Sequence, residues 1–131
     1  MSTRRNFVKK TAALGVGIAL APQLTFGTTN AKKEKLNIGL IGVGLRGTNH
    51  LNNLLSRDDC NIIAICDIDP KRISIAQDLI LGKEQKKAQI FGKYDYDYRN
   101  LLALKDIDAI IISTPWLWHT KMAKDSMKAG K

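Results

Sequence analysis

Cysteine and histidine are scarce in this chain, with two of each among 131 residues. Cys60 and Cys66 stand at the ends of one apolar run, and six residues of extended chain span roughly 20 Å at about 3.3 Å per residue. The two cysteines are therefore too far apart to bridge each other, and we expect both to be buried as small apolar side chains. No Cys/His cluster has the spacing of metal ligands, so the sequence predicts no metal site.

Acidic residues are missing from the start of the chain, where none precedes Glu34. Four basic residues stand within the first ten residues, at positions 4, 5, 9 and 10, and they supply much of the formal net charge of +9. Aromatic residues make up only 6% of the chain and do not alternate with the remaining basic residues, of which Lys83, Lys86 and Lys87 come nearest to a cluster. This distribution is typical of a solvated surface and argues against a nucleic-acid partner.

The N-terminal segment also lacks a long apolar run. Its apolar stretch, residues 12–21, has ten residues and ends at Pro22, whereas a helix that spans a bilayer core of about 30 Å takes roughly 20. The sequence therefore predicts no stable membrane span. The preceding residues 2–10 resemble the twin-arginine export motif, although Thr3 precedes the arginine pair and Val8 replaces the usual leucine.

We accordingly predict a twin-arginine-type signal peptide and linker over residues 1–31, with cleavage after Gly27 or Ala31. Such a signal would make the twin-arginine export machinery a partner and would place the mature protein in the periplasm or outside the cell. A plain amphipathic leader or an uncleaved anchor is the alternative interpretation of the same residues.

What the chain does contain is a glycine-rich segment, GVGLRG at residues 42–47, in an informative context. A strand-like apolar run, residues 36–41, precedes it and a helix-like run follows. Asp67 stands 20 residues after the last glycine, at the end of a second apolar run. This order of strand, glycine turn, helix and acidic residue is the dinucleotide-binding fingerprint. A glycine-rich turn with no ligand is the alternative.

Each glycine of the segment has its own expected role. Gly42 permits the tight turn out of the strand, Gly44 lets the backbone approach a pyrophosphate, and Gly47 lets the helix pack closely on the sheet. The helix N-terminus would then present unpaired amides and its positive dipole end to the phosphates. Asp67 would accept hydrogen bonds from the adenosine ribose hydroxyls and repel a 2′-phosphate, which favours NAD over NADP.

Strand-like and helix-like runs alternate through the rest of the chain. The expected strands are 36–41, 61–67, 90–95 and 109–114, and the expected helices are 46–57, 70–81, 98–104 and 119–129. This alternation predicts an α/β fold, a Rossmann-type doubly wound parallel sheet with strand order 3-2-1-4.

A complete dinucleotide fold has six strands. Residues 35–131 are therefore interpreted as an incomplete NAD-binding Rossmann domain, truncated after about four strands, with the C-terminal substrate domain absent. The alternating Tyr94, Tyr96 and Tyr98 suit a strand edge, and we expect them to be structural.

A second candidate site follows the last expected strand, where the segment TPWLWH occupies residues 114–119. Ligands of open α/β sheets bind at the carboxyl ends of the strands, near the point where the strand order reverses. Trp116 and Trp118, the only tryptophans of the chain, fall in this expected loop and could wall a nicotinamide or sugar ring. His119 could donate to a hydroxyl group. Alternatively, both indoles pack under another domain and His119 merely opens the next helix.

The glycine segment, AICD at residues 64–67, Thr114 and Pro115 with His119, and AGK at residues 129–131 together resemble the N-terminal half of Gfo/Idh/MocA-type oxidoreductases. The resemblance covers residues 36 to 131. Within that superfamily, the Thr-Pro-Trp-x-Trp-His form and the twin-arginine leader most resemble glycoside hydrolase family 109. Members of that family are NAD-dependent α-N-acetylgalactosaminidases.

This resemblance implies a set of cofactor contacts. Leu45 and Arg46 would present backbone to the pyrophosphate, Asp67 would bind the adenosine ribose, and residues 116–119 would contact NAD. The expected cofactor-binding residues are Gly42, Gly44, Leu45, Arg46, Gly47, Asp67, Thr114, Pro115, Trp116, Leu117, Trp118 and His119. Catalytic and substrate-binding residues would lie beyond residue 131, so none is assigned.

The resemblance also implies an activity for the full-length parent. It would be an exported NAD-dependent glycosidase that acts on α-N-acetylgalactosaminides by transient hydride transfer and elimination, with the carbohydrate held by its C-terminal domain. The chain of 131 residues alone would be inactive. The alternatives are an NAD(P)-dependent sugar or polyol dehydrogenase of the same superfamily and an inactive NAD-binding fragment.

Overall fold

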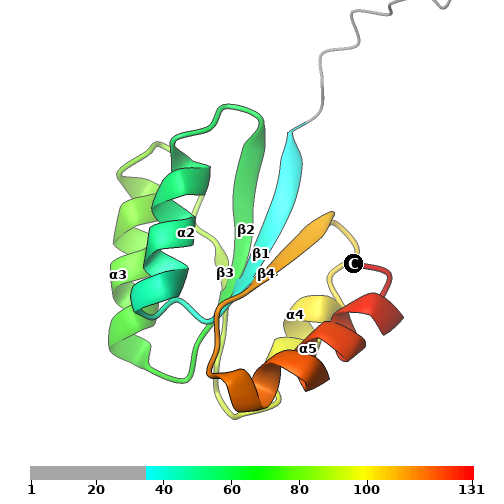
Figure 1. Ribbon diagram of the computed structural model, residues 1–131. Helices are drawn as coiled ribbons and strands as arrows, with labels where there is room; N and C mark the ends of the chain where they lie inside the picture. The colour runs from blue at the N-terminus through cyan, green and yellow to red at the C-terminus, as the bar shows by residue number, and fades with distance from the viewer. Residues whose placement is uncertain (1–34) are drawn as a thin grey trace, which may run out of the picture. The chain divides into compact units, whose positions relative to one another are not determined.

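A parallel sheet of four strands organises residues 35–131, the part of the chain that the computed structural model describes (Figure 1). The strands lie in the order β3-β2-β1-β4, and every neighbouring pair is parallel. Their bounds are Leu36–Ile41 for β1, Cys60–Cys66 for β2, Gln89–Phe91 for β3 and Ala109–Ile112 for β4. The predicted fold class and the predicted order 3-2-1-4 are confirmed.

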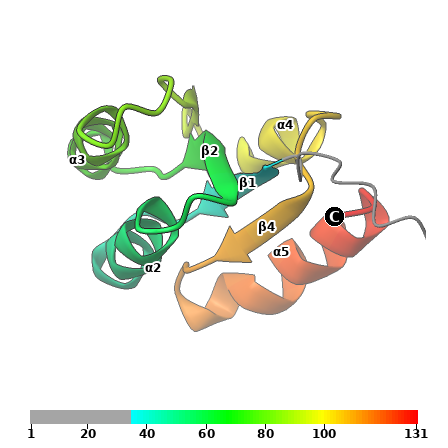
Figure 2. The same ribbon diagram turned by 90° about the horizontal axis from the view of Figure 1, so that it is seen from above.

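Helices cover both faces of this sheet. Figure 2 shows α2 and α3 on one face and α4 and α5 on the other. Their bounds are Leu45–Leu55 for α2, Pro70–Leu81 for α3, Tyr98–Leu102 for α4 and Trp116–Lys128 for α5. Within residues 35–131, none of the helices is long and apolar enough to cross a membrane. The predicted signal peptide, residues 1–31, lies outside the described residues and stays a prediction.

Each face of the sheet has its own apolar core. Leu51 of α2 and Ile80 of α3 are fully buried against the first face. Tyr98 of α4 and Met122 of α5 are buried against the second. Ile65 on β2 belongs to the first core, whereas its neighbours Ala64 and Cys66 belong to the second, because successive side chains of a strand point to opposite faces. A strand covered on both faces is mostly apolar, and β2 has the sequence CNIIAIC, in which Asn61 is the one polar residue.

Both cysteines are free and buried, as predicted, with 3% of Cys60 and 7% of Cys66 exposed. Burial raises the pKa of the Cys66 thiol to about 12, and the nearby carboxylates of Asp97 and Asp67 add to the shift. Cys66 is therefore a neutral thiol at physiological pH and not a nucleophile.

Local capping signals define α3. The Asp69 side chain accepts a hydrogen bond from the Lys71 N–H at 2.9 Å, Pro70 occupies the first helical position, and Gly82 follows the last. The helix therefore has the bounds predicted from the sequence.

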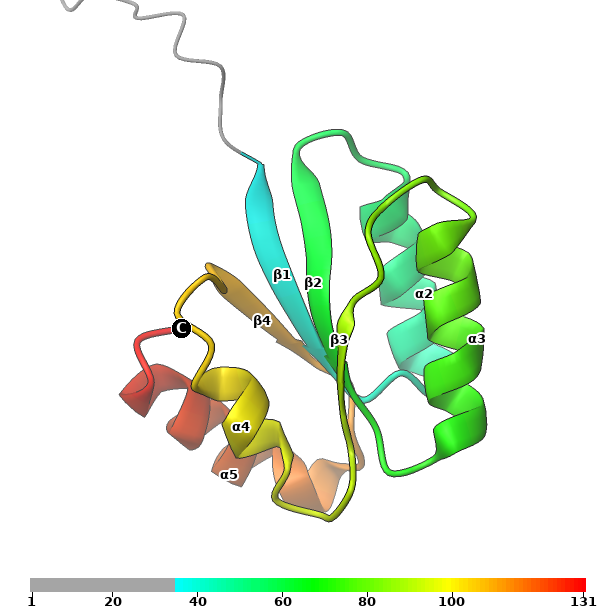
Figure 3. The same ribbon diagram turned by 180° about the vertical axis from the view of Figure 1, so that it is seen from behind.

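The chain runs from the end of α3 back to the edge strand β3 (Figure 3). A buried glutamine fixes this connection. The Gln77 side chain is 5% exposed and forms two hydrogen bonds with the backbone of Ala88. Its Nε2 donates to the Ala88 carbonyl at 2.6 Å, and its Oε1 accepts from the Ala88 N–H at 3.2 Å. This clip satisfies both backbone groups of Ala88 next to the start of β3.

We predict that Gln77→Leu lowers the free energy of unfolding by about 2–4 kcal/mol, because both backbone groups of buried Ala88 lose their partner. Urea denaturation measures the change. The control is Ser74→Ala on the exposed side of the same helix, which should shift stability by no more than about 0.5 kcal/mol. Equal losses in the two variants would contradict this role.

Candidate functional site

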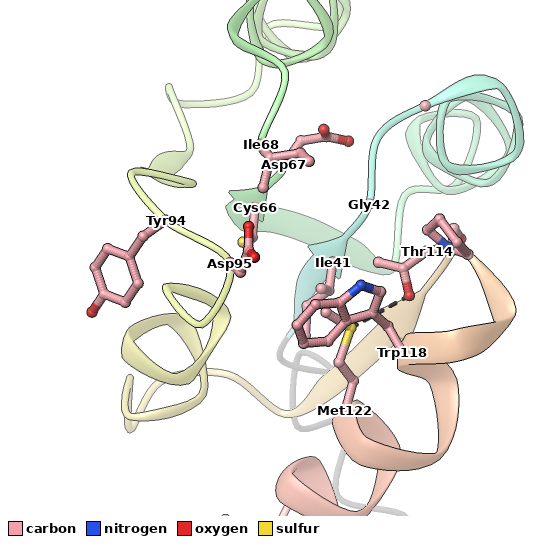
Figure 4. Close-up of a pocket in the computed structure, with 13 residues that line it drawn as sticks. Ile41, Gly42, Cys66, Asp67, Ile68, Tyr94, Asp95, Thr114, Trp118 and Met122 are labelled. Atoms are coloured by element: carbon pink, nitrogen blue, oxygen red, sulfur yellow. Dashed lines mark hydrogen bonds between the residues drawn. The ribbon is translucent and has the colours of Figure 1, made fainter.

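The carboxyl ends of β1, β2 and β4 surround a cleft of about 320 Å³ (Figure 4). It lies where the chain order of the strands reverses, because β1 has β2 on one side and β4 on the other. Its walls come from the glycine turn, the end of β2, the loop after β3, the end of β4 and α5. The lining residues are Ile41, Gly42, Gly44, Cys66, Asp67, Ile68, Tyr94, Asp95, Ser113, Thr114, Pro115, Trp118 and Met122.

The glycine turn brings backbone against backbone. Gly42 has φ +89°, and a Cβ there would lie 2.8 Å from the carbonyl carbon and oxygen of Ser113. A Cβ on Gly47 would overlap the carbonyl oxygen of Gly42, so α2 packs on the turn without a side chain between them. A Cβ on Gly44 would meet nothing within 4 Å, and Gly44 lines the cleft. The packing roles predicted for Gly42 and Gly47 agree with this geometry, and the role of Gly44 toward a pyrophosphate stays a prediction.

Helix α2 begins directly after Gly44, at the edge of the cleft. This helix has Gly44 as its N-cap, no side-chain cap and no acidic residue in its first turn. The amides of the first helical residues, including Leu45 and Arg46, have no partner within the helix. Together with the positive end of the helix dipole they form a favourable place for an anion. The Thr48 hydroxyl does not cap these amides, because it donates to the Val43 carbonyl at 3.0 Å.

Asp67 connects the end of β2 to the glycine turn. Its Oδ2 accepts a hydrogen bond from the Val43 N–H at 2.7 Å, and its Oδ1 accepts one from the Asp69 N–H at 2.9 Å. A carboxylate has about four acceptor sites, so capacity remains for two ribose hydroxyls. The sequence predicts an acidic residue here but not its bond to the turn, which depends on the pairing of β1 with β2.

The segment at residues 114–119 differs from its predicted form. It was expected to be a loop ahead of a helix at 119–129, but α5 begins at Trp116, directly after Pro115. A proline in this position is compatible with a helix start as well as with a turn, and the chain continues into the helix. The consequence is that successive side chains point in different directions around the helix axis.

Trp118 is the part of this segment that lines the cleft together with Thr114 and Pro115. Its indole lies near Ile41 and Met122 in Figure 4. Thr114 donates its hydroxyl to the sulfur of Met122 at 3.4 Å, which ties the end of β4 to α5.

The other residues of the segment lie outside the cleft lining. Trp116 is 90% exposed and Leu117 89% exposed, and His119 is also exposed. Of the twelve predicted cofactor residues, the structure gathers Gly42, Gly44, Asp67, Thr114, Pro115 and Trp118 around the cleft. Leu45 and Arg46 lie next to it on the first turn of α2, and Gly47 lies beneath the turn.

The three tyrosines do not form a strand edge, which corrects the prediction for residues 90–95. The strand β3 ends at Phe91, Tyr94 and Tyr96 lie half-exposed on the turn that follows, and Tyr98 is buried in α4. Directly after β3, the Asp97 carboxylate accepts hydrogen bonds from the backbone of Gly92 and Lys93, which shapes this turn. The period-2 pattern of tyrosines does not indicate this role of Asp97. On α5, Met122 and Ser126 are buried, whereas Met127 is 67% exposed.

Asp97 holds this turn from inside. Its Oδ2 accepts hydrogen bonds from the N–H groups of Gly92 at 2.6 Å and Lys93 at 2.9 Å, and its Oδ1 accepts one from the Asn100 side chain at 2.7 Å. The bonds from Gly92, Asn100 and Lys93 hold the pKa of Asp97 below its ordinary value. The loop after β3 is thereby ordered, and it contributes Tyr94 and Asp95 to the cleft.

Several lining residues could not be predicted from the sequence, because they stand next to the motif positions and carry no motif of their own. Ile68 follows Asp67, Ser113 precedes Thr114, and Tyr94 and Asp95 follow β3. Within residues 35–131, Ser113 Oγ is the only buried side-chain nitrogen or oxygen atom that has no hydrogen-bond partner. Strand ends in a parallel sheet signal such positions once the sheet order is known.

Residues 36–131 match the family described as an oxidoreductase family with an NAD-binding Rossmann fold. The chain belongs to the Gfo/Idh/MocA family. Its cofactor is NAD. The cleft of this Gfo/Idh/MocA domain fits NAD through the open space at Gly44, the unpaired amides of α2 and the Asp67 carboxylate at the end of β2.

Curated relatives of this Gfo/Idh/MocA chain include proteins named glycosyl hydrolase family 109. One, from Shewanella sp., is 37% identical over 119 residues, which is 91% of this chain and 26% of the relative. Another, from Shewanella baltica, is 34% identical over an alignment of 145 positions that covers 98% of this chain and 32% of the relative. The chain thus spans about a quarter to a third of the length of the curated relatives it matches.

Solved structures with the same fold include inositol dehydrogenases. The apo scyllo-inositol dehydrogenase from Lactobacillus casei has a TM-score of 0.62 at 24% identity, with 76% of this chain and 27% of that chain covered. A myo-inositol dehydrogenase from Corynebacterium glutamicum has a TM-score of 0.57 at 26% identity, with 73% and 26% covered. These likenesses support the Rossmann-like arrangement of the Gfo/Idh/MocA domain.

We predict opposite effects for two glycine substitutions in the turn. Gly44→Ala should leave the melting temperature nearly unchanged, because its Cβ meets open space, and should weaken NADH binding at least about tenfold by obstructing the pyrophosphate. Gly47→Ala should lower stability by about 3 kcal/mol or more, because its Cβ overlaps the Gly42 carbonyl. Thermal unfolding and NADH fluorescence titration measure the two effects. If Gly44→Ala binds NADH as tightly as the unmodified chain, the pyrophosphate does not lie against Gly44.

A second prediction concerns Asp67. Asp67→Asn keeps one oxygen as an acceptor for the Val43 N–H but removes the negative charge. NADH affinity should fall about tenfold, and the preference for NADH over NADPH should shrink at least about tenfold, because repulsion of the 2′-phosphate is lost. Titration with both nucleotides measures the ratio. The control, Asp78→Asn on the exposed side of α3, should leave that ratio unchanged.

Proposed function

We propose that this chain is the NAD-binding part of an exported NAD-dependent glycosidase that acts on α-N-acetylgalactosaminides by transient hydride transfer and elimination. The observation that carries the proposal is the similarity to proteins named glycosyl hydrolase family 109, at 37% identity over 119 residues. The Thr-Pro-Trp-x-Trp-His segment supports it, since three of its residues line the NAD cleft.

The residues of the cleft would divide the binding of the dinucleotide among them. The amides of Leu45 and Arg46 would hold the pyrophosphate at the N-terminus of α2. Asp67 would accept the adenosine ribose hydroxyls with the acceptor sites that Val43 and Asp69 leave free. Trp118 would form an apolar wall on the opposite side of the turn.

When bound, NAD supplies a reversible hydride acceptor, and no soluble redox partner is needed if the hydride returns to the sugar. The residues of this chain bind and orient the dinucleotide. The groups that hold the carbohydrate and move its protons belong, in this proposal, to the C-terminal domain, so no residue of this chain is assigned a catalytic role.

The proposed location is the periplasm or the extracellular space, and the proposed partner for export is the twin-arginine machinery. The support is the arginine pair at positions 4 and 5, followed by the apolar run at 12–21. This route carries folded proteins. It therefore suits a domain that must load NAD in the cytoplasm, where free NAD is found.

A sugar or polyol dehydrogenase of the same family is the second candidate. The observation that favours it is the likeness to the myo-inositol dehydrogenase from Corynebacterium glutamicum, at 26% identity and a TM-score of 0.57. Both candidates use the same NAD cleft and differ in whether the hydride leaves on the cofactor.

The deciding experiment uses the whole protein of which we propose this chain to be a part. With an aryl α-N-acetylgalactosaminide we expect release of the aryl group and no net NADH. NADH accumulation on a free sugar or polyol, without aryl release, would overturn the glycosidase in favour of the dehydrogenase.

The matched variant is Gly44→Ala, placed in the same protein. It should lose aryl release in parallel with NADH binding, because hydride transfer requires the dinucleotide. A glycosidase that uses two carboxylates has no such requirement and would retain its activity. Retention of activity in a variant that no longer binds NADH would therefore contradict the proposed mechanism.

A further inference from the structure

Tyr96 does not line the cleft, but it contacts a residue that does. Its ring packs edge-to-face against the indole of Trp118, with the ring centroids 5.5 Å apart and an interplanar angle of 72°. Trp118 in turn lines the cleft from the first turn of α5. Trp118 is half-buried against the second apolar core, and the contact with Tyr96 favours one of its rotamers.

Two cations hold the Tyr96 ring. The guanidinium carbon of Arg99 lies 5.1 Å from the ring centroid, and the ammonium nitrogen of Lys121 lies 5.4 Å from it. Both distances are within the range of cation–π attraction. Arg99 comes from α4 and Lys121 from α5, so the ring joins the two helices that precede and follow β4 in the chain.

Arg99 is itself fixed by Asp125 on α5. Its Nε donates to the Asp125 carboxylate at 3.2 Å, and the Tyr98 hydroxyl donates to the same oxygen at 2.7 Å. These partners hold the pKa of Asp125 below its ordinary value, with the Tyr98 hydroxyl as the larger cause. Arg99 is therefore anchored to the same helix that carries Trp118.

The backbone of Tyr96 is also constrained. Asp97, the next residue, is 4% exposed and its carboxylate binds the N–H groups of Gly92 and Lys93. The Arg99 N–H donates to the Tyr96 carbonyl at 3.0 Å. The ring of Tyr96 is thus held from its own loop and from both helices.

We propose that Tyr96 is a positioning residue of the cofactor cleft, which holds the Trp118 indole in the orientation that lines the cleft, with Arg99 and Lys121 fixing the Tyr96 ring. The proposal rests on the assignment of Trp118 to the NAD site. It adds a residue that acts through another, and it explains why a half-exposed tyrosine has two cations against its ring.

The experiment reports on the indole and on the cofactor separately. In a Trp116→Phe background, Trp118 is the only tryptophan, and acrylamide quenching measures its exposure. We expect Tyr96→Leu to raise the quenching constant about two-fold or more and to weaken NADH binding about three- to ten-fold. Tyr96→Phe keeps the ring and should restore both values to those of the background.

A charge-matched pair keeps the proposal falsifiable if Tyr96→Leu does not fold. Lys121→Met removes one of the two cations over the Tyr96 ring, and we expect it to raise Trp118 quenching and weaken NADH binding about two-fold. Lys124→Met makes the same charge change on the exposed side of the same helix, and we expect no effect on either quantity. Equal effects of the two lysine variants would overturn the proposal, since only net charge would then matter.

Two further results separate this proposal from the assignment on which it rests. If Trp118→Leu leaves NADH binding unchanged, the assignment of Trp118 to the cofactor site fails. If Trp118→Leu weakens binding but Tyr96→Leu changes neither quenching nor affinity, the positioning role of Tyr96 is overturned and the assignment stands. Absence of glycosidase activity in the whole protein would contradict the proposed function and leave both results intact.

Discussion

The site depends on one close approach of backbone to backbone at the glycine turn. Gly42 lies against the carbonyl of Ser113, and α2 lies against the carbonyl of Gly42 at Gly47. Strand β1, strand β4 and helix α2 therefore meet with no side chain between them. Because these contacts leave no room for a Cβ, they set the height of the α2 N-terminus above the sheet and hence the position of its free amides.

The chemistry of the cleft is distributed unevenly around this turn. On the β2 side the Asp67 carboxylate, which is bound to the turn through Val43, lines the cleft. On the β4 side the large apolar side chains of Trp118 and Met122 line it from α5. Such an arrangement orders a molecule that has a polar, charged end and a flat ring. It follows from the reversal of strand order, which places residues far apart in sequence on opposite walls.

The sequence predicted the elements whose signals are local. Helix α3 has its predicted bounds because Asp69, Pro70 and Gly82 act on the residues next to them. The predicted start of α5 was wrong, because Pro115 is compatible with both a turn and a helix. Packing of Trp118 and Met122 on the sheet favours the helix. The bond from Val43 to Asp67 could not be predicted, since it requires the register of β1 against β2.

The proposed export has a consequence for the two thiols of β2. Cys60 and Cys66 are buried at opposite ends of one strand and have no disulfide partner. In an oxidising compartment a thiol is protected by being protonated and inaccessible, which the raised pKa and the burial of Cys66 provide. A chain that crosses the membrane folded would carry this protection with it. The same chain crossing unfolded would expose both sulfurs to mispairing with other proteins before the sheet could form.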